Sequence, residues 1–250
     1  MILKGKTALV TGSSRGIGRA IAQLFYNEGA KVYIVSRKED ELKQAAQEMD
    51  TAKNGNIVPI AFDASDSASV AEAFKKIEAN KDCLNIVVNN AGVNLRGPLE
   101  EMPEETWDKV LDINLKSVFL VAKAAFPMLK QHGGKIVNIC SLMSEVARPS
   151  VAPYVASKGG VKQLTKSMAV EWAQYNIQAN GITPGYIATE MNVPLMQDQK
   201  FNDFIINRTP ARRWGKPEDI ASTALFLASS GSDFVTGQVV AVDGGILAAL

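Results

Sequence analysis

Apolar residues follow two rhythms that alternate along the whole chain. Short continuous runs of apolar and β-branched residues are typical of buried strands, and longer stretches with apolar residues every three or four positions are typical of helices. The short runs predict seven strands: Thr7–Val10, Val32–Val35, Ile57–Ala61, Asn85–Asn89, Lys135–Ile139, Ile177–Ile182 and Gln238–Val242. The longer stretches predict six helices: Ile17–Phe25, Glu39–Met49, Ser69–Asn80, Pro103–Gln131, Tyr154–Tyr175 and Pro217–Ala228.

Most of the predicted strands are apolar throughout, which is typical of a parallel sheet covered by helices on both faces. Helix-ending and helix-starting residues agree, since Pro103 and Pro217 open helices and Gly29 and Gly133-Gly134 follow them. A length of 250 residues allows one large domain or two small ones, and no linker, repeat or low-complexity tract divides the chain. We therefore predict an α/β fold over residues 1–250: a single doubly wound, Rossmann-type domain with a seven-stranded parallel sheet.

The charge balance argues against polyanionic partners. The chain has 27 Lys and Arg against 26 Asp and Glu, a net charge of +1, and no run of five like charges. Nucleic acid and anionic membranes are therefore not expected as partners. The first six residues lack the features of a signal peptide, and no apolar stretch approaches the ~18 residues that span a bilayer. We expect a cytoplasmic protein.

Histidine and cysteine are too scarce for several common kinds of site. His132 is the only histidine, and its place before two glycines indicates a helix end, where an imidazolium sits favourably against the last carbonyls. Cys83 and Cys140 lie in strand-like runs, so we expect buried thiols and no disulfide. We expect no metal site, and a serine hydrolase is disfavoured because no Gly-x-Ser-x-Gly segment accompanies His132.

A glycine-rich segment, Thr11-Gly-Ser-Ser-Arg-Gly-Ile-Gly18, follows the first predicted strand and opens the first helix. Glycines let the backbone approach a pyrophosphate, whose charge is favourable at a helix N-terminus. A glycine cluster alone often serves only a tight turn, but the strand–loop–helix context favours dinucleotide binding. The candidate residues here are Gly12, Ser14, Arg15, Gly16, Ile17 and Gly18.

Residues after the second predicted strand favour NADP(H) over NAD(H). The acidic residue that would bind a free ribose 2′-hydroxyl is missing, and the chain reads Ser36-Arg37-Lys38 instead. Ser36 and Arg37 would bind a 2′-phosphate, and Arg15 would reach the same group. The alternative is that Arg37 and Lys38 only solvate the start of the next helix. Asp63 is either a partner of the adenine amino group or a helix cap.

Tyr154 and Lys158 stand four residues apart in a predicted helix, so both side chains project from one face. An ammonium group beside a phenol, together with an oxidised nicotinamide, favours the phenolate and brings proton transfer into the neutral range. Ser141 follows a predicted strand and would hydrogen-bond the substrate oxygen where charge develops. By itself Tyr-x-x-x-Lys is common by chance.

The combination resembles the short-chain dehydrogenase/reductase family over essentially the whole chain. The motifs that carry the resemblance are Gly12-x-x-x-Gly16-x-Gly18, Asn89-Asn90-Ala91-Gly92, Asn114, Ser141, Tyr154-x-x-x-Lys158 and Pro184-Gly185. The resemblance implies a Ser141–Tyr154–Lys158 triad completed by Asn114, with Tyr154 and Lys158 also touching the cofactor. It further implies that the segment Asn89 to Gly92 supports the sheet and the adenine–ribose side, with Asn89, Ala91 and Gly92 as its cofactor-binding residues. Pro184, Gly185, Ile187 and Thr189 would hold the nicotinamide.

The substrate is read less directly. Within the family the C-terminal half is similar to gluconate 5-dehydrogenases, and the N-terminal half is also similar to 3-oxoacyl-[acyl-carrier-protein] reductases. Arg96, Glu145, Arg148 and Tyr186 lie near the expected mouth of the site and would suit a sugar acid or polyol, although each charge is equally explained as a solvated loop residue. The segment 189–209 largely sets substrate specificity in the family, but its sequence contains no motif that indicates a particular substrate.

A non-catalytic NADP-binding sensor or scaffold stays as an alternative class, because fold alone never proves function.

The fourth and fifth predicted helices carry more apolar residues than are needed for the one face that packs on the sheet, and Ile246–Leu250 is apolar to its end. Most members of the family that this chain resembles are tetramers, and together with that resemblance these surfaces predict a homotetramer built on two-fold interfaces.

Overall fold

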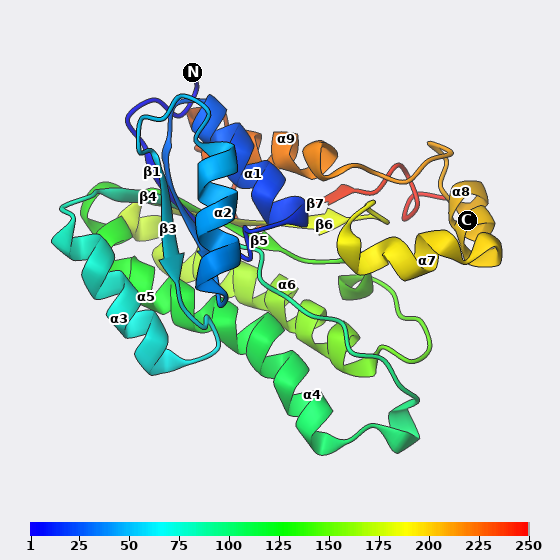
Figure 1. Ribbon diagram of the computed structural model, residues 1–250. Helices are drawn as coiled ribbons and strands as arrows, with labels where there is room; N and C mark the ends of the chain where they lie inside the picture. The colour runs from blue at the N-terminus through cyan, green and yellow to red at the C-terminus, as the bar shows by residue number, and fades with distance from the viewer. Residues whose placement is uncertain (250) are drawn as a thin grey trace.

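The structure is a computed structural model that describes residues 1–249 (Figure 1). Seven strands form one sheet in the order β3-β2-β1-β4-β5-β6-β7, and every neighbouring pair is parallel. The strands are β1 (Thr7–Thr11), β2 (Lys31–Ser36), β3 (Ile57–Ala61), β4 (Leu84–Asn89), β5 (Gly134–Ile139), β6 (Ile177–Pro184) and β7 (Val239–Val242). The predicted seven-stranded parallel sheet is confirmed.

Helices cover both faces of this sheet, as Figure 1 shows. One apolar cluster packs α1 (Gly16–Asn27), α2 (Glu39–Met49) and α9 (Pro217–Ala228) against one face. A second cluster packs α3 (Ser67–Ala79), α5 (Ser117–His132) and α6 (Ala152–Trp172) against the other. Buried strands supply side chains to both clusters, which explains why their sequences are apolar without alternation. The doubly wound architecture is confirmed.

The predicted helix Pro103–Gln131 is not continuous. It consists of α4 (Glu104–Leu111), a π-helical turn at Asp112–Lys116 and α5. A π turn adds one residue to a helical turn and so changes the direction of the side chains that follow. This turn carries Asn114, whose side chain is fully buried. The apolar spacing in the sequence runs through the turn without a visible break, so the pattern could not reveal it.

The segment 189–209, for which the sequence predicted no element, forms two helices. They are α7 (Val193–Gln197) and α8 (Gln199–Arg208), and they lie to one side of the sheet, beyond the carboxyl end of β6 (Figure 1). The Asp198 carboxylate caps α8 by accepting from the backbone N–H groups of Lys200 and Phe201. An aspartate one residue before a helix is an ordinary N-cap, and it was the signal available in the sequence.

Two predictions about scarce residues have different outcomes. His132 is the last residue of α5, and Gly133 ends the helix with a φ of 74°, as predicted. Cys140 is buried, and burial raises the pKa of its thiol to about 11. Cys83 is exposed, so the prediction of a buried thiol there is wrong. It lies just before β4, outside the strand that the apolar run suggested. No helix within residues 1–249 is long and apolar enough to cross a bilayer.

Candidate active site

The largest feature of the site is a cleft of about 730 Å³ at the carboxyl ends of the strands. The cleft lies at the ends of the neighbouring strands β1 and β4, where the strand order reverses: β2 and β3 follow β1 on one side, and β5, β6 and β7 follow β4 on the other. Ligands of doubly wound folds usually bind at this point. The cleft brings together most of the sequence-predicted residues: Gly12, Ser14, Arg15, Gly16, Ile17, Ser36, Arg37, Asp63, Ala91, Gly92, Ser141, Tyr154, Lys158, Pro184, Gly185, Ile187 and Thr189.

The glycine-rich loop lies against the segment that follows β4. Gly12 has a φ of 64°, and a Cβ there would lie 2.9 Å from the Ala91 Cα, so only glycine fits. Gly18 does not line the cleft, and glycine is needed there because a Cβ would lie 2.4 Å from the Gly12 carbonyl oxygen. Its role is close packing of α1 on the loop. Asn90, which the family resemblance placed in the supporting segment Asn89 to Gly92, holds the loop by donating to the carbonyl oxygens of Thr11 (2.9 Å) and Gly12 (3.0 Å).

The N-terminus of α1 opens into the cleft without a side-chain cap. Arg15 is the N-cap residue, and its side chain makes no capping hydrogen bond. The first N–H groups of a helix need partners from outside it, and a pyrophosphate is such a partner. Ser13 was not among the candidate residues. It connects the loop to β1 and β2, because its hydroxyl donates to the Val10 carbonyl oxygen (2.7 Å) and accepts from the Val35 N–H (2.8 Å). The residues present therefore fit a dinucleotide.

The far end of the cleft, beyond β2, is lined by charged residues of both signs. Asp63 accepts hydrogen bonds from the hydroxyl and the N–H of Ser65. Burial opposes ionisation of Asp63, yet these hydrogen bonds and the nearby Arg37 guanidinium lower the pKa of its carboxyl. The cap of α3 is Asp66, which accepts from the Ser69 N–H, so the helix-cap alternative for Asp63 is wrong.

Ser141 lies at the carboxyl end of β5 and is fixed by a small hydrogen-bond network. Its Oγ accepts from the Met143 N–H at 3.1 Å, and its own N–H donates to Ser144 Oγ at 3.2 Å. Ser144 Oγ in turn donates to the Lys158 carbonyl oxygen at 2.9 Å. The network joins the end of the strand to α6, which carries Tyr154 and Lys158. Ser141 Oγ keeps its own proton free for donation into the cleft.

Lys158 is held at the floor of the cleft. It is buried, and its ammonium group donates to the Ile139 carbonyl oxygen at 2.6 Å. The same nitrogen lies 5.8 Å from the centre of the Tyr154 ring, one helical turn away on the same face of α6. A cation is thus fixed beside the phenol, and both groups line the same cleft as Ser141.

Asn114 and Asn89 lie behind the cleft rather than in its lining. Asn114 accepts from the Val93 N–H (2.8 Å) and donates to the Val93 carbonyl oxygen (2.9 Å) and to Ser157 Oγ (3.0 Å). Ser157 Oγ donates to the Tyr154 carbonyl oxygen, so Asn114 is linked to the tyrosine through one residue. Asn89 donates to Asn138 between neighbouring strands. Neither asparagine reaches the cleft directly: Asn114 is connected to Tyr154 through Ser157, and Asn89 contacts the neighbouring strand through Asn138.

The four candidate substrate residues do not line the cleft. Arg96 and Glu145 are exposed, and Glu145 forms an ion pair with Lys162 at 2.5 Å. Arg148 donates to the Tyr186 hydroxyl at 3.3 Å and lies over the Phe201 ring of α8. The solvated-charge interpretation therefore describes Arg96 and Glu145, whereas Arg148 and Tyr186 join the cleft's rim to α8.

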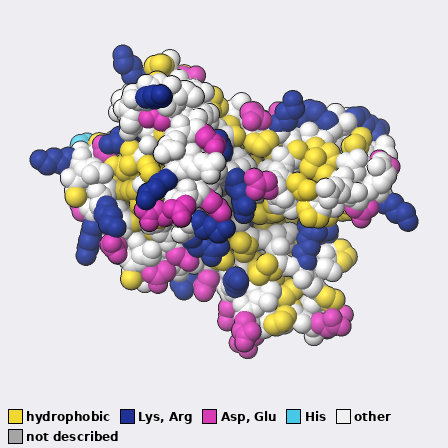
Figure 2. All heavy atoms as spheres, viewed as in Figure 1, with side chains coloured by type: hydrophobic (Ala, Val, Ile, Leu, Met, Phe, Trp, Pro, Cys, Tyr) yellow, Lys and Arg dark blue, Asp and Glu magenta, His cyan; other side chains and the backbone are white. Residues whose placement is uncertain are grey.

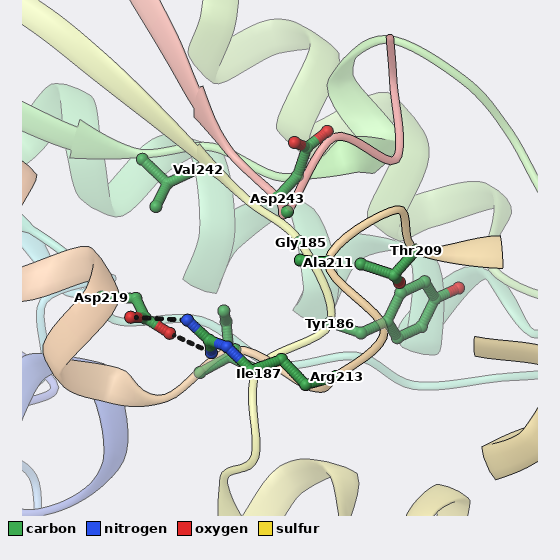
Figure 3. Close-up of a pocket in the computed structure, with 11 residues that line it drawn as sticks. Gly185, Tyr186, Ile187, Thr209, Ala211, Arg213, Asp219, Val242 and Asp243 are labelled. Carbon is green, nitrogen blue, oxygen red and sulfur yellow. Dashed lines mark hydrogen bonds and ion pairs between the residues drawn. The ribbon is translucent and has the colours of Figure 1, made fainter. Parts of the chain in front are cut away.

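A second cavity, of about 210 Å³, lies beside the end of β6 (Figure 3). Arg213 and Asp219 form a two-bonded ion pair on one side of it, and Tyr186 lies on the other. Gly185 and Ile187 line both cavities. The smaller cavity thus lies next to the backbone that bounds the larger one.

The fold and the site define a Rossmann-type α/β protein with a dinucleotide-sized cleft and a serine, a tyrosine and a lysine at its inner end. The family described as Enoyl-(Acyl carrier protein) reductase, a branch of the short-chain dehydrogenases/reductases, matches residues 12–247. The chain therefore belongs to the short-chain dehydrogenase/reductase family, and its gluconate dehydrogenase relatives are oxidoreductases acting on CH–OH groups.

Individual relatives agree over nearly the whole length. The chain is 48% identical to 2-dehydro-3-deoxy-D-gluconate 5-dehydrogenase from Formosa agariphila and 45% identical to gluconate 5-dehydrogenase from Gluconobacter oxydans, over 99% of this chain and 95% and 97% of the relatives. A 3-oxoacyl-[acyl-carrier-protein] reductase from Thermotoga maritima is 38% identical over 99% of this chain and all of its own. The crystal structure of a gluconate 5-dehydrogenase from Burkholderia cenocepacia with NADP and tartrate matches with a TM-score of 0.95 and 43% identity, over 99% and 97% of the two chains.

Proposed function

We propose that this chain is an NADP-dependent oxidoreductase that transfers a hydride reversibly between the nicotinamide and carbon 5 of a gluconate-type sugar acid. The single observation that carries the reaction type is the meeting of Ser141, Tyr154 and Lys158 in one cleft with an uncapped helix N-terminus. The relatives named as 5-dehydrogenases of gluconate or of a deoxy-keto-gluconate support the substrate class.

NADP(H) is the proposed cofactor because Ser36 and Arg37 line the far end of the cleft, where a ribose 2′-phosphate would lie. No acidic residue stands at the end of β2 to bind a free 2′-hydroxyl. The NADP complex of the Burkholderia cenocepacia relative supports this choice. When bound, the nicotinamide supplies or accepts the hydride.

The chain's own residues would handle the proton and the oxygen. Tyr154 donates its phenolic proton to the carbonyl oxygen in reduction and takes it back in oxidation. Ser141 donates a second hydrogen bond to the same oxygen and stabilises the charge that develops there. Lys158, fixed by the Ile139 carbonyl oxygen, places a positive charge near the phenol, where it would stabilise the negative charge that develops on the phenol oxygen as the proton is transferred. Asn114 positions the backbone of Tyr154 through Ser157.

A direct comparison of substrates tests the proposal. We expect the enzyme with NADPH to reduce 5-keto-gluconate with a kcat/KM at least about tenfold above that for a 3-oxoacyl thioester, a difference of about 1.4 kcal/mol in transition-state binding. The relatives named as 5-dehydrogenases of gluconate or of a deoxy-keto-gluconate support this ranking. Arg148 and Tyr186 lie outside the cleft lining and would supply polar groups only at its mouth. The opposite ranking would favour a 3-oxoacyl-[acyl-carrier-protein] reductase of fatty acid synthesis. If the protein reduces neither substrate, nor any small ketone, with NADPH, the result would favour the non-catalytic sensor.

We also propose that residues 1–250 act as one cytoplasmic domain that assembles into a homotetramer. Phe119 on α5 and Val170 on α6 are exposed, and Val170 reaches 82%. Phe226, Phe234 and Val240 form a second set of exposed apolar side chains on α9, the following loop and β7. Pairing each set with its symmetry mate would remove both from water. Ile246 is already buried within its own chain, and Leu250 lies outside the described residues.

Light scattering at micromolar concentration checks the assembly. We expect a particle of four chains, because two separate apolar surfaces each support one two-fold contact. A dimer would leave only one of the two interfaces standing. A monomer would contradict the proposal altogether.

A further inference from the structure

Positive and negative side chains are equally numerous around the adenosine end of the cleft. Figure 2 shows Lys/Arg and Asp/Glu side chains intermixed around the lower end of α2. Three cations and three carboxylates line this part of the cleft: Arg15, Arg37 and Lys38 against Glu41, Asp63 and Glu190. The formal charges cancel, although the sequence Ser36-Arg37-Lys38 alone suggests a strongly positive phosphate site. Side chains of both charges would therefore act on a 2′-phosphate bound at this end of the cleft.

Two of the three cations are already engaged by carboxylates. Lys38 Nζ lies 2.6 Å from Glu41 Oε1, within the first turn of α2. Arg15 Nη1 lies 3.0 Å from Glu190 Oε2, a contact that joins the start of α1 to the turn after β6. Arg37 forms no ion pair within residues 1–249, so it is the cation most open to a phosphate.

Both carboxylates lie on cations that a phosphate would otherwise bind, so they can compete with it. The hydrogen bond from Lys38 lowers the pKa of the Glu41 carboxyl, and the nearby Arg15 acts in the same direction. Arg15 is thus close enough to influence Glu41 while it binds Glu190. Because the four side chains of the two pairs are exposed, each pair is weak and can be broken by a dianion.

We propose that Glu41 and Glu190 set the coenzyme preference by holding Lys38 and Arg15 in ion pairs that an incoming 2′-phosphate must break. A cofactor without that phosphate leaves both pairs intact and avoids the cost. The two glutamates therefore reduce the discrimination between NADPH and NADH that Ser36 and Arg37 create. They are positioning residues, because they act on the phosphate through Lys38 and Arg15. The proposal rests on the NADP(H) assignment made above.

The test compares Glu41→Gln and Glu190→Gln with the wild-type enzyme by titration of NADPH, NADH, 2′,5′-ADP and 5′-AMP. Each substitution removes a charge and keeps the shape of the side chain. We expect each variant to bind NADPH and 2′,5′-ADP about 3- to 10-fold more tightly, with NADH and 5′-AMP changed by less than about twofold. The gain should shrink in ~1 M salt, where the Debye length is about 3 Å.

Two controls separate a charge effect from a structural one. Glu72→Gln breaks an equally exposed ion pair with Lys76 on α3, away from the cleft lining, and should change no affinity. Adding Lys38→Met to Glu41→Gln should abolish the gain, because the released lysine is its source.

Unchanged or weaker NADPH binding in both glutamine variants would overturn the proposal. An equal gain in NADH affinity would also overturn it, because the substitutions would then act on the pyrophosphate, which both cofactors share, and not on the 2′-phosphate. A wild-type enzyme that prefers NADH would instead contradict the cofactor assignment, while the change in 2′,5′-ADP affinity would still test the two glutamates.

Discussion

Replacing Tyr154 with phenylalanine is expected to lower kcat by about 10²- to 10⁴-fold, the usual contribution of general acid–base catalysis. The substitution removes the phenolic proton and keeps the ring on the same face of α6 as Lys158. Cofactor affinity should change little, because the glycine-rich loop and the α1 N-terminus are untouched. Steady-state kinetics with NADPH and 5-keto-gluconate, together with a cofactor titration, measure both quantities.

Tyr175→Phe is the matched control. Tyr175 follows the same helix, and its ring packs edge-on against Phe126, outside the cleft lining. We expect full activity from this variant. If Tyr154→Phe retains more than about a tenth of wild-type turnover, Tyr154 is not the proton donor.

The second large effect is expected at the adenosine end of the cleft. The double substitution Ser36→Asp with Arg37→Ala should weaken NADPH binding by about 10²-fold and strengthen NADH binding. The 2′-phosphate loses a guanidinium that can donate two hydrogen bonds and gains a carboxylate neighbour, and like charges brought together cost several kcal/mol. The same carboxylate can accept hydrogen bonds from a free ribose 2′-hydroxyl. Fluorescence titration with both cofactors measures the change.

Arg37→Lys is an informative control for the coenzyme change. It keeps the positive charge but loses the planar pair of donors, so an intermediate loss of NADPH affinity is expected. A wild-type protein that already binds NADH more tightly than NADPH would contradict the role of Ser36 and Arg37.

Most of the fold could be predicted from the sequence because the central strands are buried on both sides. Continuous apolar runs such as Val32–Val35 and Ile57–Ala61 indicate buried strands, and all seven predicted strands are present. The π turn around Asn114 could not be predicted, since tertiary hydrogen bonds to Val93 and Ser157 stabilise it. Helix periodicity does not report such contacts.

The candidate site was predictable where its residues belong to short motifs at strand ends. Parallel strands bring their carboxyl ends to one edge, so Gly12, Ser36 and Ser141 had to lie along the same edge of the sheet. Contacts between distant segments were not predictable, and the Arg15–Glu190 pair joins residues 175 positions apart. The places of Arg96 and Glu145, outside the cleft, likewise depend on loop geometry that the sequence does not encode locally.

Transfer of an isotopic label tests the central claim most directly. The protein is incubated with 5-keto-gluconate and NADPH that carries deuterium at carbon 4 of the nicotinamide, and the product is examined by NMR and mass spectrometry. If the chain transfers a hydride to carbon 5 with NADP(H) as its cofactor, one of the two stereoisomeric cofactors will deliver deuterium to that carbon. Formation of no reduced product, or deuterium at any other carbon, would contradict the account.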